Sequence, residues 1–421
     1  MKKILYFKLK ILAKMVLAKY KPKIIGVTGS VGKTSAKEAI FSVLDGHFNV
    51  RRNGKNFNNE IGTPLTIFGF DKSPGKNLFL WVWYFFLALK LVLIKDKKYP
   101  QVLILEMGAD KPRDITYLTS IARPSIGVIT AIGPSHLEKF KSIKNIIHEK
   151  SQILKGLGED SWAILNNDDS NLKAVISSCK TQLKTFGMKE GADVRLSDVK
   201  ITKKGDEYGT VFKLAHQGSE VPMFLPDVLG WQHAQASAIG AAVGLSMGLN
   251  LVEIGKRLLD YRPARGRTNL IKGVKNTWII DDTYNASPQS SKVALDILAE
   301  MPIAGRKIAV FGDMLELGAL SEQGHQEVGR ELVRLGIDYL FVIGERSRDI
   351  ARGARQAGME EDKIYHFPYT MEAGVFLQER LQENDVVLIK GSRGSKMEQV
   401  VYEIMARPWL AGELLVAKVI K

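Results

Sequence analysis

The chain has 421 residues, of which 45% are hydrophobic and 25% charged, and its net charge is +15. This composition is typical of a soluble globular protein of two to three domains, and it excludes a disordered chain, a collagen and a protein with many membrane spans. The single cysteine, Cys179, excludes an intramolecular disulfide and a cysteine-based metal cluster, which fits a reducing cytoplasm. The basic excess favours acidic partners, such as nucleotides or an anionic membrane surface.

Residues 1–22 are predicted to form a basic amphipathic helix. At about 100° per residue, lysines and aliphatic residues fall on opposite faces. The basic face holds Lys3, Lys10, Lys14 and Lys21. The apolar face holds Leu5, Leu9, Leu12 and Val16. Because lysines interrupt the apolar region, the segment is not a signal peptide. Two roles stay open: the helix docks on its own domain, or it lies on an anionic membrane surface.

An apolar insertion at residues 71–100 contains the stretch 78–94, in which Lys90 is the only charged residue. As a helix, this stretch would reach roughly 26 Å, which is short of the ~30 Å hydrocarbon core of a bilayer. A membrane span is therefore not expected. A buried helix stays open, as does a hairpin or an in-plane element at a membrane interface, and packing against residues 1–21 is one way to cover the stretch.

From residue 23 onward, short apolar runs alternate with longer amphipathic stretches, which is typical of α/β units on largely parallel sheets. The predicted strands are 24–28, 102–105, 126–130, 162–165, 278–280, 308–311, 340–343 and 386–389. Residues 193–226 differ, because short alternating runs rich in turn residues predict small antiparallel strands. Pro263 and Gly266 end the preceding helical pattern, so we expect one domain at 23–262 and another at 266–421.

A glycine-rich motif, Gly26-Val-Thr-Gly-Ser-Val-Gly-Lys-Thr34, follows the first predicted strand and opens a predicted helix at 35–44. Such a loop turns its backbone N–H groups toward phosphate oxygens, and the helix adds its N-terminal dipole. Its lysine would meet the β- and γ-phosphates and its threonine hydroxyl would hold Mg²⁺. The strict form of the motif has glycine where this chain has Val27, so the loop is a variant. The predicted ATP contacts are Gly29, Ser30, Gly32, Lys33 and Thr34.

An acidic residue, Glu106, ends the strand predicted at 102–105. Nucleotides bind at the carboxyl ends of strands in α/β sheets, so Glu106 is placed to hold Mg²⁺ together with Thr34. We therefore predict an α/β fold with a central phosphate-loop ATPase-type parallel-sheet domain, followed by a smaller Rossmann-like α/β C-terminal domain.

Seven motifs together resemble those of one enzyme family. In chain order they are Thr28-Gly-Ser-Val-Gly-Lys-Thr34, Asn56-Phe-Asn-Asn-Glu-Ile-Gly-Thr-Pro64, Leu105-Glu-Met-Gly-Ala-Asp110, Gly133-Pro-Ser-His-Leu-Glu138, Asp281-Asp-Thr-Tyr-Asn-Ala-Ser-Pro288, Gly312-Asp-Met-Leu-Glu-Leu-Gly318 and Lys390-Gly-Ser-Arg393. They resemble the Mur ligases, the ATP-dependent amide-forming enzymes of peptidoglycan synthesis, and most of all the MurF type. The resemblance covers residues 23–400.

This resemblance implies a mechanism in which ATP phosphorylates a peptide carboxylate and an incoming amine then attacks the acyl phosphate. It implies catalytic roles for Lys33, His136 and Lys150, and two Mg²⁺ ions held by Thr34, Glu106, His136 and Lys150. Lys150 matches a lysine that relatives carbamylate. An ammonium group cannot bind Mg²⁺, whereas a carbamate on the same side chain is a carboxylate ligand.

The resemblance also implies ligand contacts elsewhere. Nucleotide contacts are implied for Arg267, Asp282 and Asn285, and substrate contacts for Asn58, Asn59, Lys390, Ser392 and Arg393. Two departures stand out. Gly230-Trp-Gln-His-Ala-Gln-Ala236 lacks two asparagines that relatives carry near the purine, and the region before the phosphate loop is too short for the domain that holds the UDP-sugar in relatives. His325 is expected to be structural.

The predicted function is addition of D-alanyl-D-alanine, or a similar amine, to a muramoyl-tripeptide of peptidoglycan synthesis. One alternative is a family member that acts on a lipid-linked muropeptide or a polyglutamate-like acceptor. Another is a phosphate-loop ATPase or binding module without ligase activity. We expect a cytoplasmic enzyme, with contact at the inner membrane face as a further hypothesis. No nucleic-acid partner is expected, because the chain has no basic motif interleaved with aromatic residues.

Overall fold

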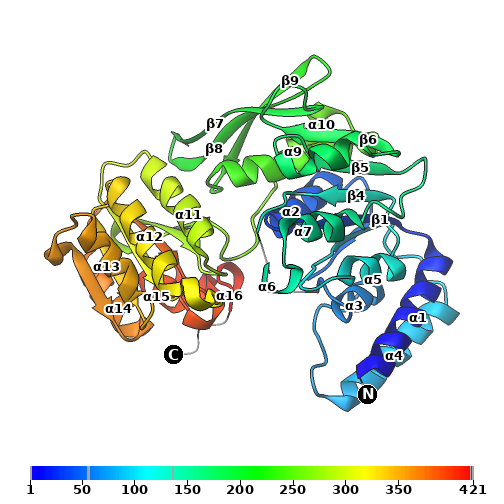
Figure 1. Cartoon of the computed structure of the whole chain (residues 1–421), viewed down its shortest axis with the longest axis horizontal. Coiled ribbons are helices and arrows are strands. Elements are labelled where there is room, and N and C mark those ends of the chain that lie inside the picture. Colours follow the sequence, from blue (N-terminus) through cyan, green and yellow to red (C-terminus); the bar gives the residue numbers. More distant parts are fainter. Residues whose placement is uncertain (1, 55–56, 135–136, 418, 420–421) are drawn as a thin grey trace. The chain divides into compact units, whose positions relative to one another are not determined.

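The computed structural model describes the chain except for residues 1, 55–56, 135–136, 418 and 420–421. The chain divides into two compact units. The first contains Met1–Asp198, Phe212–Met223 and Gln232–Arg262, and the second contains Val199–Val211, Phe224–Trp231 and Pro263–Lys421. Figure 1 shows both units, with most of the helices and the strands β1 and β4–β9 labelled.

A nine-stranded sheet in the order β2-β3-β1-β4-β5-β6-β7-β8-β9 begins in the first unit. Its pairs from β2 to β7 are parallel. Every residue of β3 is buried, as expected for a strand covered on both faces by helices. The bounds are β1 (Lys23–Thr28), β2 (Val50–Arg52), β3 (Val102–Glu106), β4 (Ile126–Ile129), β5 (Trp162–Asn166), β6 (Gln182–Gly187), β7 (Val194–Lys204), β8 (Glu207–His216) and β9 (Ser219–Pro226).

Strands β7, β8 and β9 follow one another through two-residue turns, which join only antiparallel neighbours. The antiparallel arrangement expected for residues 193–226 is therefore confirmed. These strands have 11, 10 and 8 residues, so they are longer than the small strands we predicted. Two turns, at 205–206 and 217–218, interrupt residues 194–226, which is fewer than the sequence pattern suggested.

The first unit has ten α-helices among its described residues. One apolar core packs α1, α3, α5 and α7 against the sheet, while α2, α9 and α10 pack together, with Gly240 and Gly244 of α9 close to α2. The bounds are α1 (Lys2–Tyr20), α2 (Lys33–Leu44), α3 (Gly62–Phe68), α4 (Leu78–Leu93), α5 (Asp114–Ile121), α6 (Leu137–Phe140), α7 (Ile143–Ser151), α8 (Lys173–Ser177), α9 (Trp231–Ser246) and α10 (Leu251–Leu258).

Helix α1 docks on its own unit, as one of the two predicted roles requires. Leu9 and Val16 are buried and Leu5 and Leu12 are partly buried, so the predicted aliphatic face packs inward. The insertion at 71–100 forms helix α4, in which Ala88 is the one buried residue. The buried-helix and hairpin hypotheses for this stretch are therefore wrong. Across the residues that the structure describes, no helix has the length and hydropathy needed to cross a bilayer.

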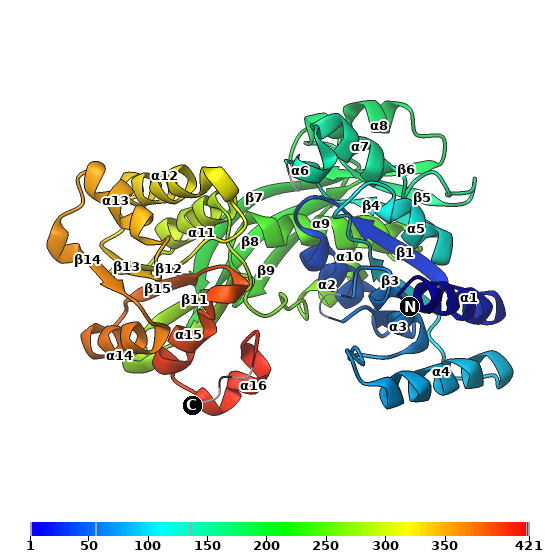
Figure 2. The ribbon, with the colours of Figure 1, turned by 60° about the horizontal axis from the view of Figure 1, so that its bottom comes forward.

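The second unit contains a six-stranded sheet in the order β10-β11-β15-β12-β13-β14, parallel except for β10. Helices α11, α12 and α13 cover one face, and α14 and α15 the other (Figure 2). The predicted α/β class is confirmed for both units. The bounds are β10 (Asn269–Lys272), β11 (Trp278–Asp282), β12 (Lys307–Gly312), β13 (Tyr339–Ile343), β14 (Ile364–Phe367), β15 (Val386–Lys390), α11 (Pro288–Glu300), α12 (Ser321–Arg334), α13 (Arg348–Gln356), α14 (Thr370–Arg380), α15 (Glu398–Ile404) and α16 (Ala411–Leu414).

Candidate active site

The phosphate loop connects β1 to α2 at the carboxyl end of the parallel sheet. Gly29 has a φ of 152° and Gly32 a φ of 81°, values that favour glycine. A Cβ atom on Gly29 would lie 1.9 Å from Thr130 Oγ1, so the loop also needs glycine for space. Ser30 fastens the loop to the next segment, because its N–H donates to Ala131 O (2.7 Å) and its hydroxyl donates to Gly133 O (2.8 Å).

Lys33, the first residue of α2, folds its side chain over the phosphate loop. Its ammonium group donates to Gly29 O (2.8 Å) and Ser30 O (3.3 Å). The positive charge therefore lies next to backbone that is shaped to receive an anion. A phosphate group near the loop would meet this ammonium together with the N-terminal dipole of α2.

Thr34 and Glu106 meet at the same end of the sheet. Strands β1 and β3 pair with Val27 opposite Glu106, which brings the acidic residue beside the loop. The Thr34 hydroxyl donates to Glu106 Oε2 (3.0 Å), and Asn58 Nδ2 donates to Glu106 Oε1 (3.1 Å). Hydroxyl and carboxylate oxygens are the ligands that Mg²⁺ prefers, and such sites hold the ion through one or two carboxylates plus phosphate oxygens. The donor set fits a magnesium–nucleotide complex.

Asn53 is a residue of this site that our sequence reasoning missed. It is buried directly after β2, and its Oδ1 accepts from Glu106 N (2.9 Å). Its Nδ2 donates to Phe57 O (2.9 Å) and Glu106 O (3.3 Å), so it fixes the end of β3. Its position directly after a strand, like that of Glu106, could have indicated a role at this edge of the sheet. The sequence did not reveal that strand, because β2 has three residues and no apolar run.

Lys150 reaches the phosphate loop from α7. Its ammonium group is buried and donates to Gly29 O (2.9 Å), the same carbonyl that Lys33 contacts. Burial, and to a smaller extent the nearby charge of Lys33, lowers the pKa of Lys150 to about 7. The neighbouring Glu149 holds α7 in place by accepting from Arg113 N and Ile115 N, both at 2.8 Å.

Two further residues of this unit, His136 and Asn59, were predicted from the sequence to be functional. His136, predicted as a metal ligand and catalytic residue, lies outside the described residues. The Asn59 side chain binds backbone N–H groups at the start of helix α3: its Oδ1 accepts from Gly62 N (2.9 Å) and Ile61 N (3.2 Å). Its carboxamide oxygen therefore has a structural use, and its predicted contact with substrate stays a prediction.

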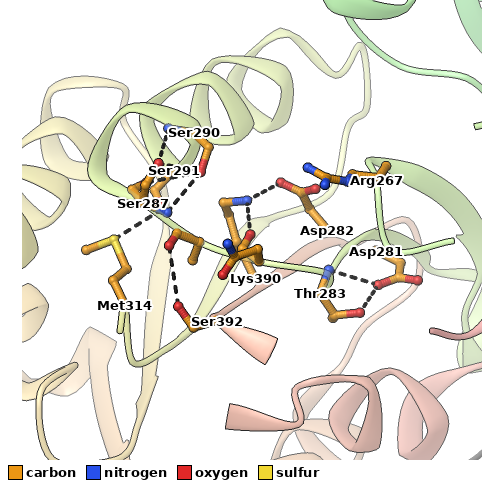
Figure 3. Close-up of polar contacts among 12 residues, drawn as sticks. Arg267, Asp281, Asp282, Thr283, Ser287, Ser290, Ser291, Met314, Lys390 and Ser392 are labelled. Carbon is orange, nitrogen blue, oxygen red and sulfur yellow. Dashed lines mark hydrogen bonds and ion pairs between the residues drawn. The ribbon is translucent and has the colours of Figure 1, made fainter. Parts of the chain in front are cut away.

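A second cluster lies in the second unit, where β11 and β15 end side by side (Figure 3). Lys390 is buried, and its ammonium donates to Asp282 Oδ2 and to Asn285 O (2.9 Å). Desolvation lowers the pKa of Lys390, while Asp282 acts in the opposite direction. Arg267 lies beside Asp282 in Figure 3, and its guanidinium packs 4.2 Å from the ring centre of Tyr284.

Asp281 is a second residue that the sequence reasoning left without a role. It is fully buried, and its Oδ1 accepts from the Thr283 hydroxyl (2.6 Å) and Thr283 N (3.2 Å). Its Oδ2 has no hydrogen-bond partner among the described residues. Burial raises the pKa of Asp281 to about 7. Through Thr283, the side chain holds the start of the turn that follows Asp282 at the end of β11.

The loop after β15 is held together by its own polar residues. The Ser392 hydroxyl is buried, accepts from Leu315 N (2.9 Å) and donates to Ala286 O (3.4 Å). Arg393 pairs with the buried Glu398 through two contacts of 2.9 Å. The roles visible here are positional, and direct contact of Lys390, Ser392 and Arg393 with an amine stays a prediction.

Two buried histidines take part in structural contacts. His325 Nε2 accepts from Met314 N (3.0 Å), and its Nδ1 lies 2.7 Å from Ser321 O, which supports the structural role we expected. His233, in the stretch that departs from the family pattern, lies with Nδ1 2.8 Å from the hydroxyl of Tyr261. Its position inside α9 ties that helix to the segment before the second unit.

Two family models match the chain: the Mur ligase middle domain over residues 87–230, and the Mur ligase, glutamate ligase domain over residues 266–393. The UDP-N-acetylmuramoyl-tripeptide–D-alanyl-D-alanine ligase of Bacillus subtilis (strain 168) is 33% identical over 397 residues, which cover 94% of this chain and 79% of that protein. The chain belongs to the Mur ligase family. The enzyme of the same name from Escherichia coli (strain K12) is 31% identical over 93% of this chain and 78% of its own length.

Solved structures agree with this assignment. The MurF ligase from Thermotoga maritima in complex with ADP matches with a TM-score of 0.76 and 27% identity, over 94% of this chain and 83% of that chain. MurF from Acinetobacter baumannii matches with a TM-score of 0.77 and 28% identity, over 93% and 79%. As a Mur ligase, the chain is an ATP-dependent ligase that forms amide bonds.

Proposed function

We propose that this ligase joins D-alanyl-D-alanine to a UDP-N-acetylmuramoyl-tripeptide in peptidoglycan synthesis. The observation that carries the proposal is the similarity to relatives of that name over 94% of the chain. This similarity spans both clusters of polar residues. The similarity does not identify the residues that take part in the reaction, nor does it indicate a role at the membrane. We argue these two points from the residues of this chain.

The chemistry follows from the proposed substrates. An oxygen of the tripeptide carboxylate attacks the γ-phosphorus of ATP, ADP leaves, and an acyl phosphate forms. The amine nitrogen of D-alanyl-D-alanine then attacks the carbonyl carbon, and inorganic phosphate leaves as the amide forms and the nitrogen loses a proton. Both steps develop charge on phosphate oxygens, so positioning and charge neutralisation dominate.

In the first unit, we propose that Lys33 leaves its loop carbonyls to contact the β- and γ-phosphates. Thr34 and Glu106 would hold Mg²⁺, with Asn58 orienting the Glu106 carboxylate. When bound, Mg²⁺ neutralises charge on the phosphate oxygens. In the second unit, Arg267, Asp282 and Asn285 are the proposed nucleotide contacts, and the loop that contains Lys390, Ser392 and Arg393 is proposed to orient the amine.

For Lys150 we propose a carbamate. The pKa of about 7 leaves a substantial fraction of Lys150 as the neutral amine at physiological pH. The neutral amine attacks the carbon of CO₂, so that an N–C bond forms, one C=O π bond becomes a C–O⁻ group and the nitrogen releases one proton. The neutral amine thereby becomes an anionic carbamate. This carboxylate would lie beside Gly29 and Lys33, where an anionic ligand is needed for a second Mg²⁺.

Substitution of Lys150 tests the carbamate. We expect Lys150→Ala to lose at least roughly a hundredfold in kcat, since the group oriented at the phosphate loop is removed. Acetate should restore part of the activity by filling the vacated ligand position, whereas bicarbonate should not. The matched control is Lys155→Ala, which removes an exposed lysine just beyond α7. Wild-type turnover by Lys150→Ala would remove the carbamate from the mechanism.

The ligase assignment is tested by product formation. Purified protein is incubated with ATP, Mg²⁺, UDP-N-acetylmuramoyl-tripeptide and D-alanyl-D-alanine, and the product is identified by mass spectrometry. Phosphate release should require both the tripeptide and the amine. Release of phosphate with ATP alone, and no amide product, would identify an ATPase instead.

A lipid-linked muropeptide is the second candidate acceptor. The observation that favours it is the row of apolar side chains that α1 and α4 expose to solvent. An enzyme held at the cytoplasmic face of the membrane would meet such an acceptor directly. The same assay with a lipid-linked acceptor in mixed micelles distinguishes the two substrates by their kcat/KM.

A further inference from the structure

Helix α1 exposes a second apolar face in addition to the one it buries. Ile4, Phe7, Ile11 and Met15 recur at helical spacing and are 41–63% exposed. These residues lie among exposed lysines of the same helix, Lys8 and Lys14. An isolated exposed aliphatic side chain needs no explanation, but a continuous helical row of them in a folded protein does.

Helix α4, which packs beside α1, also exposes an apolar row, with larger side chains. Its buried side packs Trp81, Phe85 and Ala88 against the core of the first unit. Its other side exposes large apolar residues along the whole helix. We name the two exposed rows together the α1–α4 surface, which consists of Ile4, Phe7, Ile11 and Met15 with Leu78, Phe79, Val82, Trp83, Phe86, Leu89, Leu93 and Ile94.

Specific contacts fix the two helices side by side (Figure 1, Figure 2). The Lys19 ammonium donates to Leu91 O (3.1 Å) and Val92 O (2.8 Å), which are carbonyls at the end of α4. The hydroxyl of Tyr20 donates to Leu91 O and Ile94 O, both at 3.1 Å. The C-terminal ends of the helices therefore meet and the helices run parallel, so their exposed rows belong to a single fixed element.

The charged side chains of α1 and α4 themselves all have one sign. Residues 2–20 and 77–95 contain no aspartate or glutamate, and Lys8, Lys14 and Lys90 are exposed within them. Residues 96–98 add two lysines and one aspartate. In a symmetric dimer through this surface, lysines of one copy would meet the lysine-bearing helices of the other, which offer no acidic residue to pair with.

We propose that the α1–α4 surface binds an anionic membrane. Apolar and aromatic side chains such as Trp83 and Phe86 would enter the boundary between headgroups and acyl chains, while the lysines contact lipid phosphates. α4 would lie in the plane of the interface, since it is too short and too firmly packed on one side to cross the bilayer. This inference does not depend on which substrate the ligase uses.

Vesicle flotation of the full chain tests the proposal. We expect the protein to float with vesicles of equal parts phosphatidylcholine and phosphatidylglycerol, and to bind pure phosphatidylcholine at least roughly tenfold more weakly at low salt. Trp83→Glu with Phe86→Glu should lower binding to the anionic vesicles by roughly tenfold or more. The matched control is Trp409→Glu, which changes an exposed tryptophan of the second unit.

A second pair of variants separates the charge contribution. Lys8→Glu with Lys14→Glu should reduce binding and its salt dependence, whereas Lys173→Glu with Lys180→Glu, which changes net charge equally at exposed positions of α8 and the segment after it, should not. All variants are checked for an unchanged melting temperature. If the full chain stays unbound to both vesicle types, or if Trp83→Glu with Phe86→Glu instead dissociates a dimer seen by analytical ultracentrifugation, the proposal is wrong.

Discussion

At the residue scale, the buried carboxyl of Asp281 makes the free energy of unfolding depend on pH. Its folded-state pKa of about 7 lies above the ordinary value of 3.8 that it regains on unfolding. Between these values the folded state therefore binds more protons than the unfolded state, and stability falls as pH rises. Above the folded pKa both states are ionised, and the loss reaches a constant value of about 4 kcal/mol.

Asp281→Asn should flatten this dependence. The amide keeps an oxygen for Thr283 but buries an NH₂ group, so we expect a loss of about 1 kcal/mol at pH 5 and a stability equal to or above wild type at pH 8. Chemical denaturation across this pH range measures the effect. The exposed Asp362→Asn in the same unit serves as the control. Parallel pH profiles for wild type and Asp281→Asn would contradict the assigned pKa.

Gly29 is the residue on which the shape of the phosphate loop depends most. Gly29→Ala places a methyl group where Thr130 Oγ1 already lies, at a φ of 152°. We expect a destabilisation of about 2 kcal/mol or more, because neither the loop nor the segment after β4 can move without breaking the contact of Ser30 with Ala131. Thermal unfolding and nucleotide titration measure the two effects, with Gly158→Ala as the control. Unchanged nucleotide affinity would show that the loop conformation is not required.

At the scale of elements, the attachment of α4 depends on few polar groups. Tyr20→Phe removes a hydroxyl that donates to Leu91 O and Ile94 O and accepts from Asp96 N (2.8 Å). We expect local opening of residues 91–96 to become easier by about 0.5–1.5 kcal/mol, since partly exposed backbone groups lose a hydrogen-bond partner. Hydrogen exchange of those amides is the measurement. Tyr6→Phe on the same helix is the control, and equal exchange in both variants would contradict the prediction.

For the whole molecule, nucleotide binding should appear as added stability. With a non-hydrolysable ATP analogue and Mg²⁺ at a hundred times Kd, linkage predicts about 2.7 kcal/mol of stabilisation. We expect a higher melting temperature with the analogue, and a much smaller increase for Lys33→Ala because that variant lacks the phosphate contact. The melting temperature of Lys33→Ala without nucleotide should stay close to wild type. A full increase in Lys33→Ala would show that the phosphates bind elsewhere.

Much of the fold is legible in contiguous stretches of sequence. The strands predicted at 24–28, 102–105 and 308–311 formed within one residue of each bound, since an apolar run between turn residues has few alternatives in an α/β protein. The phosphate loop was also predictable, because its glycines, Lys33 and Thr34 act through neighbouring backbone. Strand β2 and Asn53 were missed, because three residues carry too little pattern to identify a strand.

The sequence by itself determined the α/β class, the phosphate loop and the family, because each depends on residues close together in the chain or on motifs in a set order. Tertiary structure decided which side chains lose contact with water. Lys150 acquires its lowered pKa, and Lys390 its pairing with Asp282, from elements distant in sequence. Tertiary structure also decided which face of α4 packs on the protein and which faces solvent. Residues 78–94 are apolar on all sides, so their helical periodicity does not identify the packed face until α1 lies against it.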